Sequence, residues 1–233
     1  MIIHLAGTRG VADHGWLKSA HTFSFANYYN PERMNFGVLR VINDDVIAPG
    51  TGFGRHPHRD MEIITIPLQG SVIHEDSEGN KGVISKGEIQ VMSAGTGIFH
   101  SEFSDKVEET KLLQIWVFPK KLQIHPRYEQ KKFLLNERKN KLQLIVSPDS
   151  RNGSLMINQD AFFSVGEFEN GQIFQCRPFQ ENHGAYIFII SGSFEINGHV
   201  FKAKDGIGIP AFDSLTFKAL GTSELLLMEL PMG

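Results

Sequence analysis

The sequence has a single cysteine, Cys176, among 233 residues. One cysteine cannot form an internal disulfide, and no Cys-x-x-Cys pair is present to hold zinc or to exchange thiols. Long hydrophobic runs are also missing, because stretches such as residues 185–190 fall far short of the roughly 20 residues that span a bilayer. The first nine residues lack the basic start and apolar core of a signal peptide. These absences predict a cytoplasmic protein without a membrane segment.

Excess charge is absent too. Lys and Arg number 23 and Asp and Glu number 26, which gives a net charge of -3. A chain without excess positive charge is not expected to bind nucleic acid or an anionic membrane. It also lacks a Walker loop, a nucleophile elbow and a G-x-G-x-x-G turn after a strand, which leaves NTPase, hydrolase and dinucleotide-dependent functions unsupported.

Short apolar runs separated by glycine and proline dominate the chain, with 23 Gly and 10 Pro in total. Short apolar segments separated by such turn-forming residues are typical of an all-β protein. We predict strands at residues 37–43, 63–68, 72–75, 89–92, 112–118, 173–177, 185–190, 193–196, 200–203, 206–209, 215–217 and 225–230. The pair Asn197-Gly198 is the strongest hairpin signal among them.

The two halves of the chain resemble each other. Leu68-Gln-Gly70-Ser-Val72 aligns with Ile190-Ser-Gly192-Ser-Phe194, which indicates two copies of one β-unit. We therefore predict domains at residues 1–120 and 142–233, joined by a basic connector at 121–141. A solvated linker with a short helix around 127–132 is favoured there over a contact for an anionic partner.

Three of the ten histidines have a spacing that strand geometry can turn into a metal site. His56 and His58 are two residues apart, and side chains at that spacing point to the same side of an extended chain. Pro57 between them is tolerated at an edge or at the start of a strand. His100 and Glu102 repeat the same spacing further along. Together they offer three imidazoles and a carboxylate, a set that suits Fe(II), Ni, Cu, Mn or Zn and excludes an oxygen-only calcium cage.

A lone His-x-His pair is a weak signal, but its surroundings strengthen it. A glycine-rich approach precedes His56, Glu62 and Gly70 follow it, and Gly95-Thr-Gly97 precedes His100. This order resembles the two motifs of the cupin superfamily of small metal-binding β-barrels. A longer series resembles the pirin family over essentially the whole chain: His14-Gly-Trp-Leu17, His21-Thr-Phe-Ser-Phe25, Leu39-Arg-Val-Ile-Asn43, His56-Pro-His-Arg-Asp-Met-Glu62, Ser93-Ala-Gly-Thr-Gly97 and His100-Ser-Glu102.

The resemblance implies a bicupin, that is, two β-barrels of which only the first binds metal. It implies His56, His58, His100 and Glu102 as the ligands. General cupins take their carboxylate from the first motif, which here would be Glu62. By alternation Glu62 shares a face with His56 and His58. It therefore remains an alternative, either as a metal ligand or as a hydrogen-bond partner of a ligating histidine. We favour Glu102 as the ligand, with Glu62 hydrogen-bonded inside the barrel.

The second half serves as an internal control. Glu181-Asn-His183 stands where we align His56-Pro-His58, and residues 211–217 contain no counterpart of His100. We therefore expect a second barrel without metal and His183 as an isolated polar residue. The same interpretation applies to the histidines without ligand spacing: His4, His14, His74, His125 and His199. We interpret the aromatic segment 21–29 and Cys176 as packing residues.

Bacterial members of the resembled family include proteins described as quercetin 2,3-dioxygenases. This implies one divalent metal per chain, with Fe(II) first and Cu, Ni, Mn, Co or Zn as alternatives, a flavonol-like aromatic substrate and dioxygen. Ring cleavage would release carbon monoxide, with Glu102 as the catalytic general base. We expect Phe53, Ile64, Ile66 and Phe99 to form the apolar walls. The alternative is a metal-dependent regulatory protein that binds a protein partner and performs no turnover.

Overall fold

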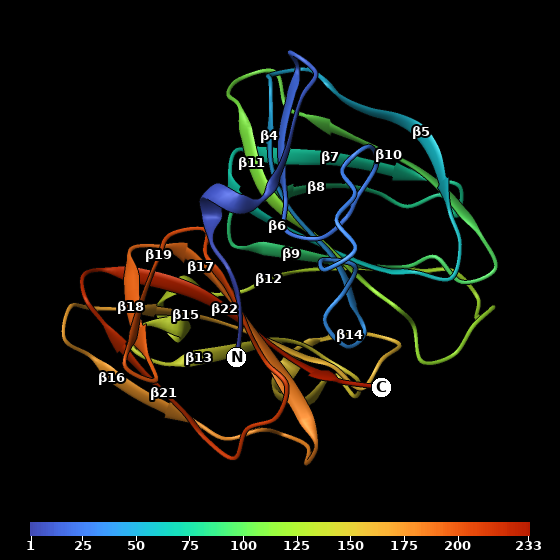
Figure 1. Cartoon of the computed structure of the whole chain (residues 1–233). Coiled ribbons are helices and arrows are strands. Elements are labelled where there is room, and N and C mark those ends of the chain that lie inside the picture. The colour runs from blue at the N-terminus through green and yellow to red at the C-terminus, as the bar shows by residue number, and fades with distance from the viewer.

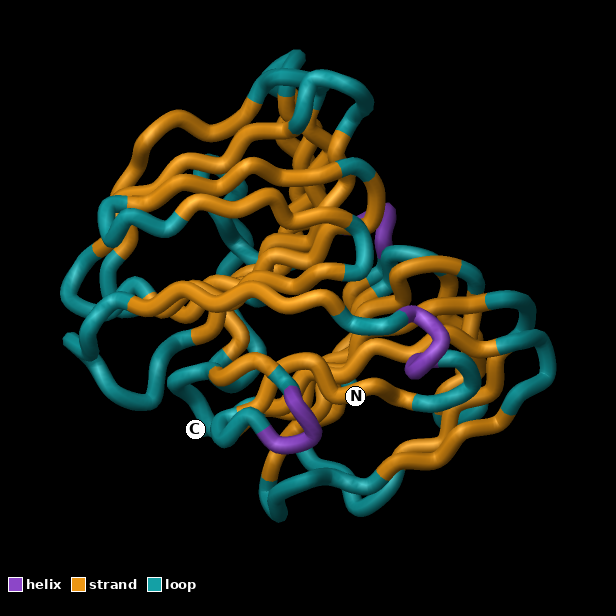
Figure 2. Tube along the Cα trace, turned by 180° about the vertical axis from the view of Figure 1, so that it is seen from behind, coloured by secondary structure: helices purple, strands orange, loops and turns teal.

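Two β-barrels packed side by side form the molecule, and a computed structural model describes all of its residues, 1–233. Figure 1 shows the first barrel mainly in blue to green and the second mainly in yellow to red, and Figure 2 shows strands joined by loops and turns, with very little helix. Three short 3-10 helices complete it: η1 (Ala6–Thr8), η2 (Leu135–Arg138) and η3 (Arg151–Gly153). The predicted all-β bicupin fold is confirmed. None of the helices has the length and apolar composition needed to cross a membrane.

The first barrel consists of a seven-stranded sheet facing a four-stranded sheet. The larger sheet has the order β12 (Arg127–Lys132), β9 (Glu88–Ser93), β6 (Glu62–Gln69), β11 (Thr110–Val117), β4 (Leu39–Ile47), β3 (Leu17–His21) and β2 (Gly10–Asp13). The smaller one has the order β5 (Gly52–His58), β10 (Ile98–Ser104), β7 (Ser71–Asp76) and β8 (Lys81–Ser85).

The second barrel repeats this plan except at one edge of its larger sheet. Its larger sheet has the order β1 (Ile2–His4), β20 (Gly206–Ile209), β17 (His183–Ser191), β22 (Ser223–Pro231), β15 (Phe162–Phe168), β13 (Leu142–Ser147) and β14 (Leu155–Met156). At that edge β14 pairs parallel to β13, while β2 of the first barrel pairs antiparallel to β3. Its smaller sheet has the order β16 (Ile173–Cys176), β21 (Leu215–Ala219), β18 (Ser193–Ile196) and β19 (His199–Lys202). The predicted Asn197-Gly198 hairpin is confirmed between β18 and β19, with φ of 51° and 77° at the two turn residues, as a two-residue hairpin turn requires.

The two barrels exchange edge strands. β1, at the start of the chain, pairs with β20 of the second barrel, and Figure 1 shows the N-terminus among the strands of that barrel. β12, in the predicted connector, pairs along its whole length with β9 of the first barrel. The short helix that we predicted at residues 127–132 is therefore wrong, because the alternation of these residues completes a sheet edge. Residues 2–4 likewise pair outside the predicted first domain.

The main hydrophobic core lies between the barrels. It contains 25 buried residues, contributed by the outward faces of the two large sheets, including Ile64, Leu113, Phe163 and Met228. The interior of the second barrel holds a further cluster of 14 apolar residues. Inside the first barrel the apolar clusters have only five and four members. The interior of the first barrel is therefore the part of the fold that is free for polar chemistry.

Candidate metal centre

His56, His58 and His100 converge inside the first barrel. β5 carries His56 and His58 on one side, and β10 pairs with it so that His100 lies opposite His56. The ring centroids are 4.4 Å apart for His56 and His100, and 4.8 Å apart for each of the other two pairs. One ring nitrogen from each histidine lies within 4.8 Å of the other two. Neighbouring strands thus bring His100 to a pair of histidines more than 40 residues earlier in the sequence.

The chemistry of this cluster fits a cation. Both ring nitrogens of His100 are buried and have no hydrogen-bond partner in the protein. Buried polar atoms are almost always paired, so an orphaned imidazole among other imidazoles calls for a further partner. Burial, reinforced by the neighbouring histidines, lowers the pKa of His100 to about 2 and that of His58 to about 4. The rings of His58 and His100 are therefore neutral, as metal-binding imidazoles must be.

A backbone contact orients one of these rings. The Nδ1 atom of His56 lies 2.8 Å from the carbonyl oxygen of Gly54. A carbonyl can only accept, so Nδ1 carries the proton and Nε2 keeps its lone pair for a ligand. A second partner that fixes the tautomer is a regular feature of metal-binding histidines.

Glu102 lies on the same strand as His100 but groups with a different neighbour. Its carboxylate forms a second potential ligand group with His100 and His74. Thr65 donates to Oε1 at 3.3 Å and Gln114 donates to Oε2 at 2.8 Å. Burial is the main cause that raises the pKa of Glu102 to about 7. His100 is thus shared by two overlapping groups, the three histidines and the His74–Glu102 side.

Glu62 does not face the histidines, and the predicted shared face is wrong. Its carboxylate accepts hydrogen bonds from Ser93 Oγ at 2.8 Å and from the backbone N–H of Asn158 at 3.1 Å. Asn158 belongs to the second half, so Glu62 points into the seam between the barrels instead of into the first barrel. The alternation breaks because Asp60, with φ of 47°, turns the chain from the small sheet into the large one.

A cavity of about 380 Å³ lies inside the first barrel, and its lining contacts the metal centre through Phe53 and Gln114 without including the three clustered histidines. Phe53 lines it and lies 6.2 Å from the His56 ring, and Gln114 lines it while donating to Glu102. Of the predicted apolar walls only Phe53 is found here. The two isoleucines, Ile64 and Ile66, belong to the core between the barrels, and Phe99 is 47% exposed.

The large sheet of the first barrel presents a row of polar residues to the barrel interior. Pairing from strand to strand gives the row His21, Asn43, Gln114, Thr65, Gln90 and Gln130. The equivalent row of the second barrel is Leu144, Ser164, Leu227, Ile187, Ile207 and Ile3. The same fold therefore tolerates an apolar row, and the polar row of the first barrel is not required by the architecture.

The ligand positions are replaced in the same way. Leu215 pairs with Cys176 where His100 pairs with His56, and Phe217 pairs with Ile196 where Glu102 pairs with His74. The second barrel accordingly contains no cluster of three potential ligands. Our alignment of Glu181-Asn-His183 with His56-Pro-His58 is wrong, because β16 is the equivalent of β5 and His183 begins the next strand.

Several histidines outside the predicted ligand set have identifiable partners. His183 is not isolated, because its Nδ1 lies 3.1 Å from the carboxylate of Glu229. His4 Nδ1 lies 2.8 Å from the Tyr186 hydroxyl. His74, predicted to be unrelated to the site, stands beside Glu102 on the neighbouring strand β7. A sequence signal for it exists, since His74 and Asp76 repeat the two-residue spacing of the other site residues.

The aromatic segment after β3 divides between two environments. Phe23 is buried in the core between the barrels, as the packing interpretation expects. His21, Phe25 and Tyr28 instead line the cavity of the first barrel. Asp45 also lines the cavity and was missed by the sequence analysis. Burial raises its pKa to about 7, and the Ser19 hydroxyl donates to its carboxylate.

The fold and the histidine cluster define a cupin of two barrels with one candidate metal centre. Comparison with protein families supports this assignment. The family model described as Pirin matches residues 4–117, and the family model described as Quercetinase C-terminal cupin domain matches residues 144–230. The chain belongs to the pirin family.

Individual relatives cover nearly the whole chain. A protein of Escherichia coli (strain K12) named quercetin 2,3-dioxygenase is 46% identical over 228 residues, covering 97% of this chain and 96% of its own. A pirin-like protein of Caulobacter vibrioides is 42% identical over 221 residues, covering 94% and 95%. The crystal structure of the bacterial pirin YhhW from Escherichia coli in complex with nickel(II) superposes with a TM-score of 0.94 at 44% identity, covering 100% of this chain and 99% of its own.

Proposed function

We propose that the protein is a metal-dependent dioxygenase that cleaves flavonols such as quercetin. The observation that carries the proposal is the pair of buried, unpartnered nitrogens of His100 between two further imidazoles, next to a cavity of about 380 Å³. The Escherichia coli relative named quercetin 2,3-dioxygenase supports the reaction, and the nickel(II) complex of YhhW supports a divalent metal.

His56, His58, His100 and Glu102 are the proposed ligands of one divalent metal, with Fe(II) the first candidate. Cu, Ni, Mn, Co and Zn suit the same nitrogen and oxygen donors. When bound, the metal polarises an oxygen-containing substrate and holds it next to dioxygen. Glu102 is the proposed general base, because its carboxylate groups with His100 and its two hydrogen bonds, from Thr65 and Gln114, hold it in the barrel.

The cavity supplies contacts for a flat polyhydroxylated ring system. Phe25 and Phe53 provide aromatic walls, and Asp45 and Asn43 provide hydrogen-bond acceptors for hydroxyl groups. Only one oxygen of Asp45 accepts a hydrogen bond from the protein, that from Ser19. A buried carboxylate with a free oxygen rejects ligands that lack a donor, because its own desolvation is then uncompensated. We assign Asp45 as the acceptor for a substrate hydroxyl.

The test is turnover by protein reconstituted with one metal at a time. Metal-free protein is loaded with Fe(II), Ni(II), Cu(II), Mn(II) or Co(II) and mixed with quercetin in aerated buffer, and flavonol absorbance and carbon monoxide are followed. We expect loss of the flavonol with at least one metal. No turnover with any metal would favour the regulatory alternative.

Two histidine variants link turnover to the site. His100→Ala is expected to lose bound metal, from about one ion per chain to near zero, together with activity. His199→Ala is the control, since His199 is exposed on β19 of the second barrel. Unchanged metal content in His100→Ala would refute the proposed site.

A further inference from the structure

A histidine that binds a metal uses one ring nitrogen, and its other ring nitrogen needs a hydrogen-bond partner. In His56 that second nitrogen faces the carbonyl oxygen of Gly54 at 2.8 Å. His58 is partly exposed, so solvent can serve as its partner. His100 differs from both, because it is 1% exposed and neither of its ring nitrogens has a partner. The acceptor for His100 must therefore lie inside the first barrel.

Three side chains on β7 and β10 are close enough to be considered. Strand pairing places Asp76 opposite His100, and His74 opposite Glu102. Ring nitrogens of His74 and His100 lie within 4.8 Å of each other, and a carboxylate oxygen of Glu102 lies within the same distance of both. All three candidate side chains are buried. The partners that each of them already has decide between them.

The two carboxylates are occupied. Asp76 Oδ1 accepts hydrogen bonds from the backbone N–H groups of Glu78 and Asn80, both at 3.0 Å. Its Oδ2 accepts from the side-chain amide of Asn80 at 2.9 Å. Both oxygens of Glu102 also accept hydrogen bonds, and Glu102 is itself a proposed metal ligand. Neither carboxylate is therefore the natural acceptor for His100.

His74 has the free lone pair that the two carboxylates lack. Its Nε2 lies 3.2 Å from Oδ2 of Asp76. The other contacts of Asp76 all come from N–H donors, so this carboxylate acts as an acceptor, and Nε2 of His74 carries the proton. Nδ1 keeps its lone pair, and it is buried without a donor. An acceptor buried in this way costs free energy that an N–H group of His100 recovers.

Neighbouring strands hold the His74 ring in place. The Tyr128 ring of β12 stacks on it, with centroids 4.6 Å apart and planes at 25°. The Tyr128 hydroxyl in turn donates to Gln130 at 2.6 Å. Gly82, which pairs with His74 from β8, leaves room for this contact, because a Cβ atom there would lie 2.7 Å from the Tyr128 hydroxyl oxygen. Three strands thus fix the orientation of one imidazole.

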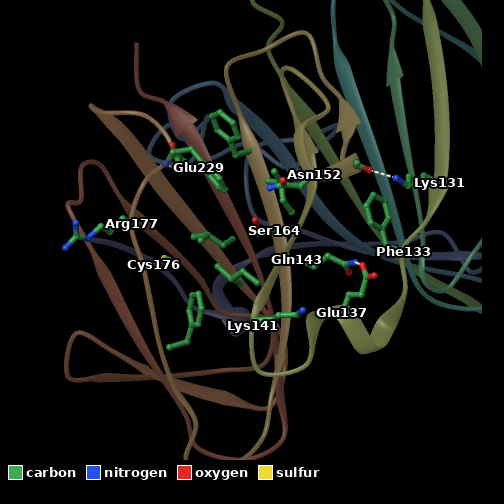
Figure 3. A pocket seen from close by; sticks show the side chains of 17 residues that line it. Lys131, Phe133, Glu137, Lys141, Gln143, Asn152, Ser164, Cys176, Arg177 and Glu229 are labelled. Carbon is green, nitrogen blue, oxygen red and sulfur yellow. Dashed lines mark hydrogen bonds between the residues drawn. The ribbon is translucent and has the colours of Figure 1, made fainter.

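The second barrel lacks this arrangement together with the metal ligands. Ile196 stands at the position of His74, and Gly198 follows it at the spacing of Asp76. Figure 3 shows Cys176, at the position of His56, among the side chains that line a cavity of that barrel. The fold therefore does not require a histidine paired with an aspartate at this place.

We propose that His74 is a positioning residue that accepts the second N–H of His100 and so sets the orientation of this ligand. Asp76 fixes the tautomer of His74 and completes a chain of one carboxylate and two imidazoles. Ring nitrogens of His74 and His100 lie within 4.8 Å, a gap that a turn of either ring or one bridging water closes. The inference rests on the proposed metal site and makes neither His74 nor Asp76 a ligand.

The nickel(II) affinity of two His74 variants tests the proposal. Metal-free full-length proteins, shown by urea unfolding to be folded, are titrated with Ni(II) in competition with a chelator. His74→Leu offers no acceptor and is expected to weaken binding by about tenfold to a hundredfold. His74→Asn places an amide oxygen at the same distance from the backbone as Nδ1, and it is expected to lose less than about fivefold.

The order of the two variants separates an acceptor from a packing residue. Leucine fills buried apolar space better than asparagine does, so a residue that only packs would give the weaker binding to His74→Asn. Unchanged binding by His74→Leu overturns the proposal, and so does binding by His74→Asn that is equal to or weaker than that of His74→Leu.

Two further variants locate the effect. His183→Leu is the matched control, because His183 is also a buried histidine beside a carboxylate, 3.1 Å from Glu229 in the second barrel, and its Ni(II) affinity is expected to stay unchanged. Retention of Ni(II) by His100→Ala would refute the proposed metal site. Loss of Ni(II) by His100→Ala together with unchanged binding by His74→Leu overturns only the role of His74.

A measurement on the unmodified protein does not depend on whether a variant folds. In zinc(II)-loaded protein with isotope-labelled histidine, nuclear magnetic resonance of the ring nitrogens reports the tautomer of each imidazole. We expect His74 to be protonated at Nε2, and His100 to carry a proton on its non-ligating nitrogen that exchanges slowly with solvent. A proton on Nδ1 of His74 overturns the proposal.

Discussion

Replacing Asp45 by asparagine is expected to stabilise the protein and impair its activity. The Asp45 side chain is 2% exposed, and the hydroxyl of Ser19 is its only hydrogen-bond donor. Burial is the main cause that raises its pKa from 3.8 to about 7. The folded state thus opposes ionisation of this group, and the neutral amide of asparagine avoids that cost while still accepting from Ser19.

The magnitude follows from the shift in pKa. A folded-state pKa above the unfolded one means that the folded state binds the extra proton between these values, so stability falls as pH rises through that window. A pKa shift of about three units corresponds to a loss of about 4 kcal/mol of folding stability. This loss is complete above pH 7 and absent below pH 4. Asp45→Asn should therefore gain stability over the unmodified protein by about 2 kcal/mol at pH 5 and about 4 kcal/mol at pH 8.

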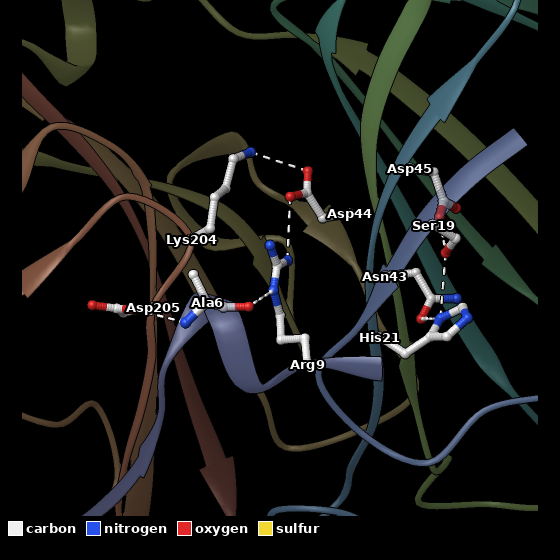
Figure 4. A network of polar contacts seen from close by, with 9 residues as sticks. All are labelled: Ala6, Arg9, Ser19, His21, Asn43, Asp44, Asp45, Lys204 and Asp205. Carbon is white, nitrogen blue, oxygen red and sulfur yellow. Dashed lines mark hydrogen bonds and ion pairs between the residues drawn. The ribbon is translucent and has the colours of Figure 1, made fainter. Parts of the chain in front are cut away.

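The neighbouring residue Asp44 provides a matched control with the opposite sign. Figure 4 shows Asp44 turned toward Arg9 and Lys204, at 3.2 Å and 3.0 Å, and Asp45 turned toward Ser19 on the other side of the strand. Asp44→Asn removes ion pairs to two cations and should cost about 1 to 3 kcal/mol. Urea unfolding from pH 5 to 8.5 measures both variants.

The activity of Asp45→Asn decides between two roles for the residue. If Asp45 accepts a substrate hydroxyl, its replacement should reduce kcat/KM for quercetin by about tenfold or more. A variant with the predicted stability gain and full activity would refute the assignment to the substrate. A flat difference in stability across pH would refute the electrostatic reasoning.

Three further predictions concern separate parts of the molecule. Glu102→Gln should lower metal content and abolish turnover, whereas Glu62→Gln should keep its metal, as measured by elemental analysis. Burial lowers the pKa of His4 from 6.5 to about 4, so the free energy of unfolding should fall by up to about 3 kcal/mol as pH falls through that window. The free energy of unfolding of His4→Gln should therefore depend less on pH than that of the unmodified protein. Leu113→Ala, fully buried between the barrels, should cost about 2 to 5 kcal/mol in thermal or urea unfolding.

The sequence predicted the histidine cluster because its geometry is local to two strands. His56 and His58 share a side of β5 by alternation, and the same two-residue spacing marks His100 and Glu102. Alternation fails where the chain changes sheets, and the turn at Asp60 therefore sends Glu62 to the other side. A single residue in the left-handed conformation is not visible in a pattern of apolar and polar residues.

Long-range pairing accounts for the remaining differences. β1 has only three residues and carries no strand signal of its own, so its place beside β20 is decided by the fold around it. β12 is basic and polar. A sequence pattern cannot show that it forms the edge strand of a sheet whose neighbouring strand lies more than 30 residues earlier. The partnership of His74 with Glu102 has the same origin, because it exists only once β7 pairs with β10.

The duplicated barrel explains how one chain can carry a polar interior at all. A row of buried polar residues crosses the first barrel, and buried groups without full partners, such as the amide of Gln90, cost free energy. The second barrel has the same strand order with leucine and isoleucine along most of that row, and the seam between the barrels adds the largest core of the molecule. Because the barrels exchange edge strands, the stability of the seam and of the second barrel is shared with the first. Separating the barrels by cutting the chain should therefore unfold the first one, since it would lose both the seam and the support for β12.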